Sequence, residues 1–158
     1  MTIRPPFADE REYVLNSWRE AYRYAPGGRC GRWRDYEARI TPMFNAVLDR
    51  DDTRVLVKHI ENVIVGYIVF ARGIHADTVH WVQTRYRVGD ARLRRKGTMR
   101  ELVEAADLKP FVAYTFRGPL PRKGEDGPRV TADTWIVPWL MRRRIGAAFL
   151  DYKQWSAR

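Results

Sequence analysis

Residues 88–102 read VGDARLRRKGTMREL, and this stretch decides the fold. It begins at the end of a β-prone segment, passes through a basic loop and enters a helical pattern. Four basic residues lie between positions 92 and 96, and Gly97 lets the backbone approach a ligand closely. Unpaired N–H groups at a helix N-terminus carry the positive end of the helix dipole. The stretch therefore predicts a strand-to-helix turn that attracts an anion.

Upstream of this turn, the sequence predicts three successive strands. Asp77-Thr78 opens the nearest one, which runs from Val79 to Val88. Before it, Thr53–Ile60 and Val63–Phe70 have strand composition and are joined by Glu61-Asn62. This pair indicates an antiparallel hairpin, with a bulge at Gly66.

The first fifty residues predict a short strand and two helices. Thr2–Pro5 has the composition of a strand that ends at prolines, and Asp9 is the expected cap of the first helix. The second helix is expected from Asp35 to Leu48, with a kink or a fresh start at Pro42. Helical spacing places Val14, Leu15, Trp18, Ala21 and Tyr22 on one apolar face, and Tyr36, Ile40, Met43, Phe44 and Val47 on another.

Downstream of the turn, a helix from Thr98 to Leu108 and a strand from Phe111 to Phe116 are expected. The tail predicts a loop at 118–128, a strand at 130–137 and a short amphipathic helix at 145–155. The whole order favours an α+β, three-layer α/β/α fold with a mixed, mostly antiparallel central sheet. We expect a core of residues 1–117 and an irregular basic C-terminal extension of residues 118–158 packed on the same domain.

The turn at residues 94–99 resembles the acyl-CoA signature of the GNAT N-acetyltransferase superfamily. That signature has Gln or Arg, two variable residues, Gly, one variable residue, and then Gly or Ala. Arg94 and Gly97 match it, whereas Met99 departs from its last position. The order of elements over about residues 2–116 is similar as well.

The resemblance implies a GNAT-like fold, acetyl-CoA as cofactor and transfer of an acetyl group to an amine. It implies that the CoA pyrophosphate lies on the turn and that the pantetheine arm lies along the end of the preceding strand. The cofactor-binding residues would then be Tyr86, Arg87, Val88, Arg94, Arg95, Lys96, Gly97, Thr98 and Met99.

Catalytic residues are harder to place. GNAT enzymes commonly use a carboxylate as general base, through water, and a tyrosine as general acid. No Asp or Glu lies between Thr78 and Val88. His80 is a candidate base, because its reference pKa is about 6.5, and Tyr114 is a candidate acid. For both, packing within the sheet is the alternative, and the sequence predicts no metal site.

The charge balance indicates the kind of partner. Subtracting 19 acidic from 29 basic residues gives a net charge of +10, which favours polyanions: CoA phosphates, nucleic acid or an acidic protein face. Trp135, Trp139 and Trp155 surround an arginine run at 142–144, a pattern of single-strand binding or of ordinary packing. No apolar run is long enough to span a bilayer, and the chain starts without a signal-peptide pattern. The lone Cys30 excludes an internal disulfide and fits a reducing compartment. The expected location is the cytoplasm, or a virion if the chain is phage-encoded.

Two functions remain open on this reasoning. One is an acyl-CoA-dependent N-acetyltransferase. The other is a catalytically inactive GNAT-like binding or structural protein, for example a bacteriophage virion component that contacts nucleic acid or other virion proteins. The sequence sets no oligomeric state.

Overall fold

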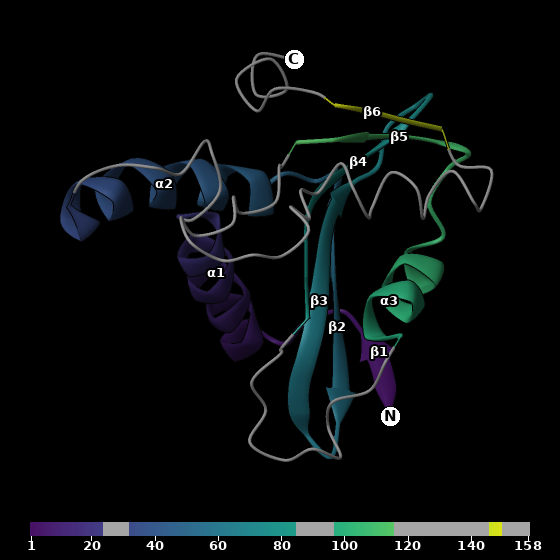
Figure 1. The fold of residues 1–158 in the computed structure, drawn as a ribbon, viewed down its shortest axis with the longest axis horizontal. Coiled ribbons are helices and arrows are strands. Elements are labelled where there is room, and N and C mark those ends of the chain that lie inside the picture. The colour runs from purple at the N-terminus through teal and green to yellow at the C-terminus, as the bar shows by residue number, and fades with distance from the viewer. Residues whose placement is uncertain (24–31, 85–96, 116–145, 150–158) are drawn as a thin grey trace, which may run out of the picture.

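The computed structural model describes residues 1–23, 32–84, 97–115 and 146–149. A six-stranded sheet lies at its centre, with its strands side by side in chain order (Figure 1). The first four strands pair antiparallel, and the last two pairs are parallel. The strands are β1 (Thr2–Arg4), β2 (Thr53–Ile60), β3 (Val63–Ala71), β4 (Asp77–Thr84), β5 (Phe111–Tyr114) and β6 (Gly146–Phe149). The expected mixed, mostly antiparallel sheet is therefore confirmed.

The β2–β3 hairpin forms as its sequence predicts. Glu61 and Asn62 have φ values of 49° and 64°, as a two-residue type I′ turn requires. Lys58 pairs with Gly66 and His59 pairs with Ile64, so one residue of β3, Val65, has no partner on β2. The bulge thus lies directly beside the glycine that was expected to mark it.

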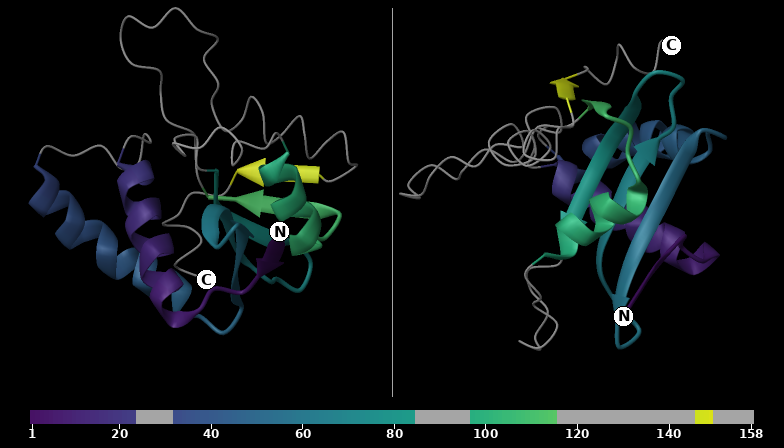
Figure 2. Two further views of the ribbon diagram at one scale, coloured as in Figure 1. Left: turned by 90° about the horizontal axis from the view of Figure 1, so that it is seen from below. Right: turned by 90° about the vertical axis from the view of Figure 1, so that its right-hand side faces the viewer.

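Three helices of the described residues cover the two faces of the sheet. Helices α1 (Ala8–Tyr22) and α2 (Trp33–Leu48) lie on one face, and α3 (Thr98–Ala106) lies on the other (Figures 1 and 2). The apolar stripes of α1 and α2 face each other and the sheet, and Trp18 stacks on Phe44 with ring centroids 3.9 Å apart. This burial supplies much of the driving force for folding. The arrangement confirms the three-layer prediction.

The start of α1 differs from the prediction, and of the two alternatives expected at Pro42 the structure excludes a fresh helix start. Helix α1 begins at Ala8 rather than after an Asp9 cap, because the carboxylate of Glu10 accepts a hydrogen bond of 2.7 Å from the Phe7 amide and takes over the capping role. Helix α2 runs as one element through Pro42. Its apolar face packs on both sides of the proline, which offsets the loss of one backbone hydrogen bond.

The far end of α3 is fastened to the sheet by Asp77, a fully buried residue at the start of β4. Its carboxylate accepts hydrogen bonds from Arg72, at 2.8 Å, and from the Lys109 amide, at 3.0 Å. Arg72 also donates to the carbonyl oxygens of Ala106 and Asp107, which end the helix. A cation at a helix C-terminus also interacts favourably with the helix dipole.

The tail is the part that sequence periodicity predicted wrongly. Residues Gly146–Phe149, expected within a helix, form β6 in parallel with β5. Backbone pairing along the open edge of β5 outweighs the local helical spacing in this segment. The loop expected at 118–128 and the strand expected at 130–137 lie outside the described residues. Among the described helices, none is both long and apolar enough to cross a membrane.

Candidate functional site

Helix α3 begins at a glycine that adopts a left-handed backbone. Gly97 has φ +100°, and its carbonyl oxygen accepts the first helical hydrogen bond, from the Glu101 amide at 2.9 Å. The amides that precede Glu101 in the first turn point out of the helix start, as at every helix N-terminus. The residue type and the geometry therefore agree with the predicted anion-binding turn.

The start of α3 lies unusually close to the sheet, and Gly66 of β3 makes this possible. A Cβ added at Gly66 would lie 2.8 Å from the Gln83 carbonyl oxygen and 2.9 Å from the Thr98 Cγ2. Both distances are shorter than Cβ atoms tolerate. The absence of a side chain at Gly66 thus lets the first turn of α3 rest on the backbones of β3 and β4.

A buried lysine lies beneath this turn. The Lys58 side chain is 0% exposed, and its ammonium lies 2.7 Å from a carboxylate oxygen of Glu101. It also donates a hydrogen bond of 3.2 Å to the Thr98 hydroxyl. A buried ammonium is costly unless it is paired, so both partners on α3 hold the helix in place over β2.

Met99 departs from the family pattern, and its side chain is half-buried and packs against the hydrophobic core. Gly97, Thr98 and Met99 lie at the start of α3, and their role in binding a pyrophosphate stays a prediction. The other predicted cofactor-binding residues, Tyr86, Arg87, Val88, Arg94, Arg95 and Lys96, lie outside the described residues and stay predictions.

Strand β4 extends beyond its described pairing with β5. It pairs with β5 only from Asp77 to Val79. On its other side Val79 pairs with Phe70 and Trp81 with Val69, so His80 is an extra residue that forms a bulge. From Trp81 to Thr84, the only strand partner among the described residues is β3. An extended ligand can pair with the backbone along such an edge.

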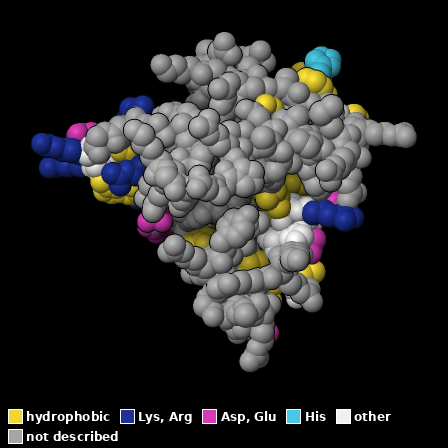
Figure 3. Space-filling model, in the orientation of Figure 1, with side chains coloured by type: hydrophobic (Ala, Val, Ile, Leu, Met, Phe, Trp, Pro, Cys, Tyr) yellow, Lys and Arg dark blue, Asp and Glu magenta, His cyan; other side chains and the backbone are white. Residues whose placement is uncertain are grey.

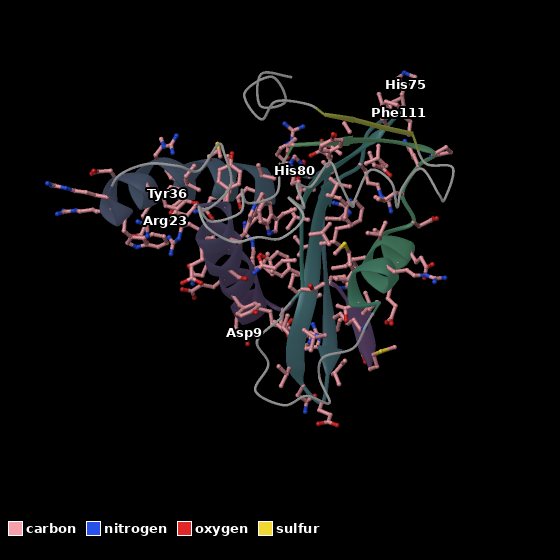
Figure 4. The ribbon with its side chains drawn as sticks, viewed as in Figure 1. Asp9, Arg23, Tyr36, His75, His80 and Phe111 are labelled. Carbon is pink, nitrogen blue, oxygen red and sulfur yellow. The ribbon has the colours of Figure 1, made fainter. Side chains whose placement is uncertain are left out.

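His80 lies in the interior, against the helix layer (Figure 4). It is 1% exposed, its ring lies 6.5 Å from that of Trp18, and its Nδ1 lies 3.2 Å from the Thr115 hydroxyl. Burial lowers the pKa of His80 to about 3, so the ring is neutral at physiological pH. Tyr114 is also buried in the core and pairs with Val79. Both side chains occupy the packing positions that the sequence left as alternatives.

Sequence reasoning missed Lys58, although it left a signal. Lys58 is the second charged residue of an otherwise apolar and β-branched strand, and the first, Arg54, is exposed. Lysine at a core-facing strand position needs a partner, but its partners Thr98 and Glu101 are forty or more residues away, so spacing could not identify them. Of the described residues, no three His, Cys, Asp or Glu side chains are grouped to hold a metal ion.

Basic side chains on the described surface gather at the end where α2 projects from the sheet (Figure 3). This fits the overall net charge of +10.

No family model matches the chain, and no curated protein matches it. Among solved structures, it is similar to the PaiA N-acetyltransferase of Thermoplasma acidophilum in complex with coenzyme A (12% identity, 67% of this chain and 69% of that chain, TM-score 0.44). It is also similar to a ribosomal-protein-alanine N-acetyltransferase from Brucella melitensis biovar Abortus 2308 (18%, 66% and 68%, TM-score 0.43). A third is an aminoglycoside acetyltransferase from an uncultured soil metagenomic sample in complex with sisomicin (12%, 90% and 86%, TM-score 0.45). The activities in these names are those of the three solved proteins.

Proposed function

We propose that the chain is an acyl-CoA-dependent N-acyltransferase of the GNAT type, which transfers an acetyl group to an amine. The observation that carries the proposal is that the α3 start rests on Gly66 of β3, which also contacts the Gln83 backbone in the part of β4 that has no β5 partner among the described residues. An anion-binding turn close to such a strand segment suits a ligand with a diphosphate at one end and an amide-rich arm at the other. Acetyl-CoA has this composition, and it supplies the acyl group as a reactive thioester.

The residues of the chain would have separate tasks. The amides of the first turn of α3, with Gly97 at its start, would bind the pyrophosphate, and the ion pair between Lys58 and Glu101 would hold this turn in place on the sheet. A backbone N–H of the open edge of β4 would bind the thioester carbonyl oxygen as charge develops there. The amine nitrogen then bonds to the carbonyl carbon, the carbon–sulfur bond breaks, and the proton lost by the amine neutralises the thiolate. Holding both reactants in place supplies much of the rate.

A titration with acetyl-CoA tests the proposal. A ligand that binds only the folded state at about 100 times its dissociation constant adds about 2.7 kcal/mol to the free energy of unfolding. We expect the melting temperature to rise and saturate with acetyl-CoA, and we expect the rise to shrink in Gly97→Ala, whose side chain disfavours φ +100°. An unchanged melting temperature at millimolar acetyl-CoA would contradict CoA binding.

A binding or structural protein of the same fold is the second candidate. The observation that favours it is the burial of both candidate catalytic side chains, His80 and Tyr114. This candidate predicts that acetyl-CoA, or a polyanion at the basic surface, binds without turnover. Release of free thiol from acetyl-CoA in the presence of an amine panel separates the two candidates.

A further inference from the structure

A cavity of about 510 Å³ lies on the opposite face of the sheet from α3. It is bounded by the second half of α1, the start of α2 and the end of β4. Its described lining consists of Ser17, Glu20, Ala21, Arg23, Trp33 and Gln83. This volume is within the range of pockets that bind small molecules.

The amide of Gln83 has a fixed orientation in this cavity. Its Oε1 accepts hydrogen bonds from the Trp81 indole, at 3.0 Å, and from the Tyr67 hydroxyl, at 2.9 Å. An indole N–H can only donate, so the atom that faces it must be the amide oxygen. The NH2 group of Gln83 is therefore turned away from Trp81 and Tyr67. Because Gln83 lines the cavity, these two N–H donors are available to a ligand there.

This orientation rests on a buried polar network rather than on a surface side chain. Tyr67 is 1% exposed, and burial raises its pKa above the ordinary value, so its hydroxyl stays protonated and donates. The network joins β3 and β4 beside Ser17 of α1, which lines the cavity.

The other polar groups of the cavity have defined charges. The guanidinium of Arg23 lies over the Trp33 ring, 4.9 Å from its centroid, and Figure 4 shows Arg23 where α1 meets α2. Arg23 therefore offers further donors and a positive charge. Glu20, which is exposed at the cavity, offers an acceptor and a negative charge. The cavity thus combines donors for an oxygen acceptor with one carboxylate for a cation.

We propose that this cavity binds a primary amine that carries a carboxylate or carbonyl group beside it, that is, a free amino acid or the N-terminus of a peptide. Gln83 and Arg23 bind the carboxylate or carbonyl oxygen, and Glu20 attracts the ammonium. The inference rests on the proposed function, because it identifies the class of amine that accepts the acyl group.

The position of the cavity suits this role. The side chain of Gln83 faces the cavity, while its backbone carbonyl oxygen lies against Gly66, beside the first turn of α3. The cavity and the α3 start therefore lie at the same end of β4, on opposite faces of the sheet. A ligand held along the open edge of β4 would reach from one to the other.

Gln83→Glu tests the inference with little disturbance of the fold. A glutamate oxygen still accepts from Trp81 and Tyr67, but the second oxygen replaces the NH2 donors by negative charge. The probes are L-amino acids, their C-terminal amides, dipeptides with a free N-terminus, and the corresponding decarboxylated amines. Calorimetry measures the affinity of the protein for each probe in the absence of acetyl-CoA. We expect the wild type to bind amines with a neighbouring carboxylate or carbonyl about 10- to 100-fold more tightly than decarboxylated amines. In Gln83→Glu this preference should be lost or reversed.

Two controls keep the outcomes distinct. Asn16→Asp makes the same amide-to-acid change on α1 at a residue that does not line the cavity, and it should leave the preference unchanged. Arg23→Gln should weaken the binding of free amino acids more than the binding of their amides. Tighter binding of free amino acids than of dipeptides would identify small molecules as the acceptors, and the reverse would identify peptide N-termini.

Equal binding of decarboxylated amines, or a preference that Gln83→Glu leaves intact, would overturn the inference. The acetyl-CoA titration separates this failure from that of the proposed function. Stabilisation by acetyl-CoA without selective amine binding contradicts only the ligand class. Selective amine binding without stabilisation by acetyl-CoA supports the ligand class and contradicts acyl transfer.

Discussion

At the scale of the residue, Glu10 joins three segments of the chain through one carboxylate. It accepts two hydrogen bonds from Arg4, at 2.7 and 2.9 Å, and one from the Phe7 amide. Its Oε1 also lies 2.7 Å from His59 Nε2. Hydrogen bonds from Arg4 are the largest cause that lowers the pKa of Glu10, to about 2. Glu10 thus connects the start of α1 to β1 and β2.

The pKa of Glu10 predicts how the stability depends on pH. A carboxyl whose pKa is lower in the folded state than in the unfolded state stabilises the fold above its unfolded pKa, and this contribution is lost as pH falls through the folded value. We expect Glu10→Gln to lower the free energy of unfolding at pH 7, and the deficit to shrink between about pH 4.5 and pH 2. Urea unfolding across this pH range measures it. Glu12→Gln, an exposed residue of the same helix, is the control, and an equal deficit in both variants would contradict the argument.

Gly66 is a second single residue on which the fold depends, because of space rather than backbone conformation. We expect Gly66→Ala to destabilise the protein by about 1–3 kcal/mol, since its Cβ would meet the Gln83 carbonyl oxygen and the Thr98 and Leu102 side chains. Stabilisation by acetyl-CoA should weaken as well, because α3 must move. Thermal unfolding with and without acetyl-CoA measures both effects.

A second substitution checks the cause. Thr98→Ser removes the Cγ2 that the new Cβ would meet at 2.9 Å and keeps the hydroxyl that binds Lys58. Added to Gly66→Ala, it should restore part of the stability. The contact with the Gln83 backbone remains, so full recovery would show that the crowding is not where the structure places it.

At the scale of the element, the position of α3 on the sheet depends on the ion pair between Lys58 and Glu101. Lys58 is buried and Glu101 is about a third exposed. Removing Glu101 should therefore cost more stability than removing Lys58. Glu101→Leu leaves a buried ammonium whose remaining described partner is the Thr98 hydroxyl, and we expect a loss of up to about 3 kcal/mol. Lys58→Met leaves a carboxylate that water can reach, and it should cost less.

A double-mutant cycle measured by chemical unfolding tests this pairing. In Lys58→Met with Glu101→Leu, apolar side chains replace both charges, and the double variant should be more stable than the sum of the single losses predicts. Additive losses would mean that the two residues act independently.

At the scale of the whole molecule, the elements with local signals were predictable from sequence. The Glu61-Asn62 turn, the stripe of α1 and the glycine before α3 each determine their structure within a few residues. Features that depend on segments far apart in the sequence were not predictable. The burial of Lys58 depends on a helix that begins forty residues later, and β6 forms because β5 offers an edge for pairing. The proposed acceptor cavity likewise joins residues from α1, α2 and β4, which no spacing pattern connects.

The pairing of β6 predicts that the expected core of residues 1–117 is incomplete. Without β6, the outer edge of β5 has no described strand partner, and an unpaired edge promotes self-association. Two truncations isolate the effect: residues 1–149 keep β6, whereas residues 1–145 lack it. We expect the shorter chain to melt at least about 4 °C lower, since 1 kcal/mol shifts the melting temperature of a chain of this size by about 2–4 °C. Size-exclusion chromatography should show more of the shorter chain as an oligomer.

If both truncations melt alike and remain monomeric, β6 is dispensable, and residues 1–117 should be purified alone as the folding unit. If only the shorter one fails, the fold extends into the C-terminal segment, because the sheet requires its last strand.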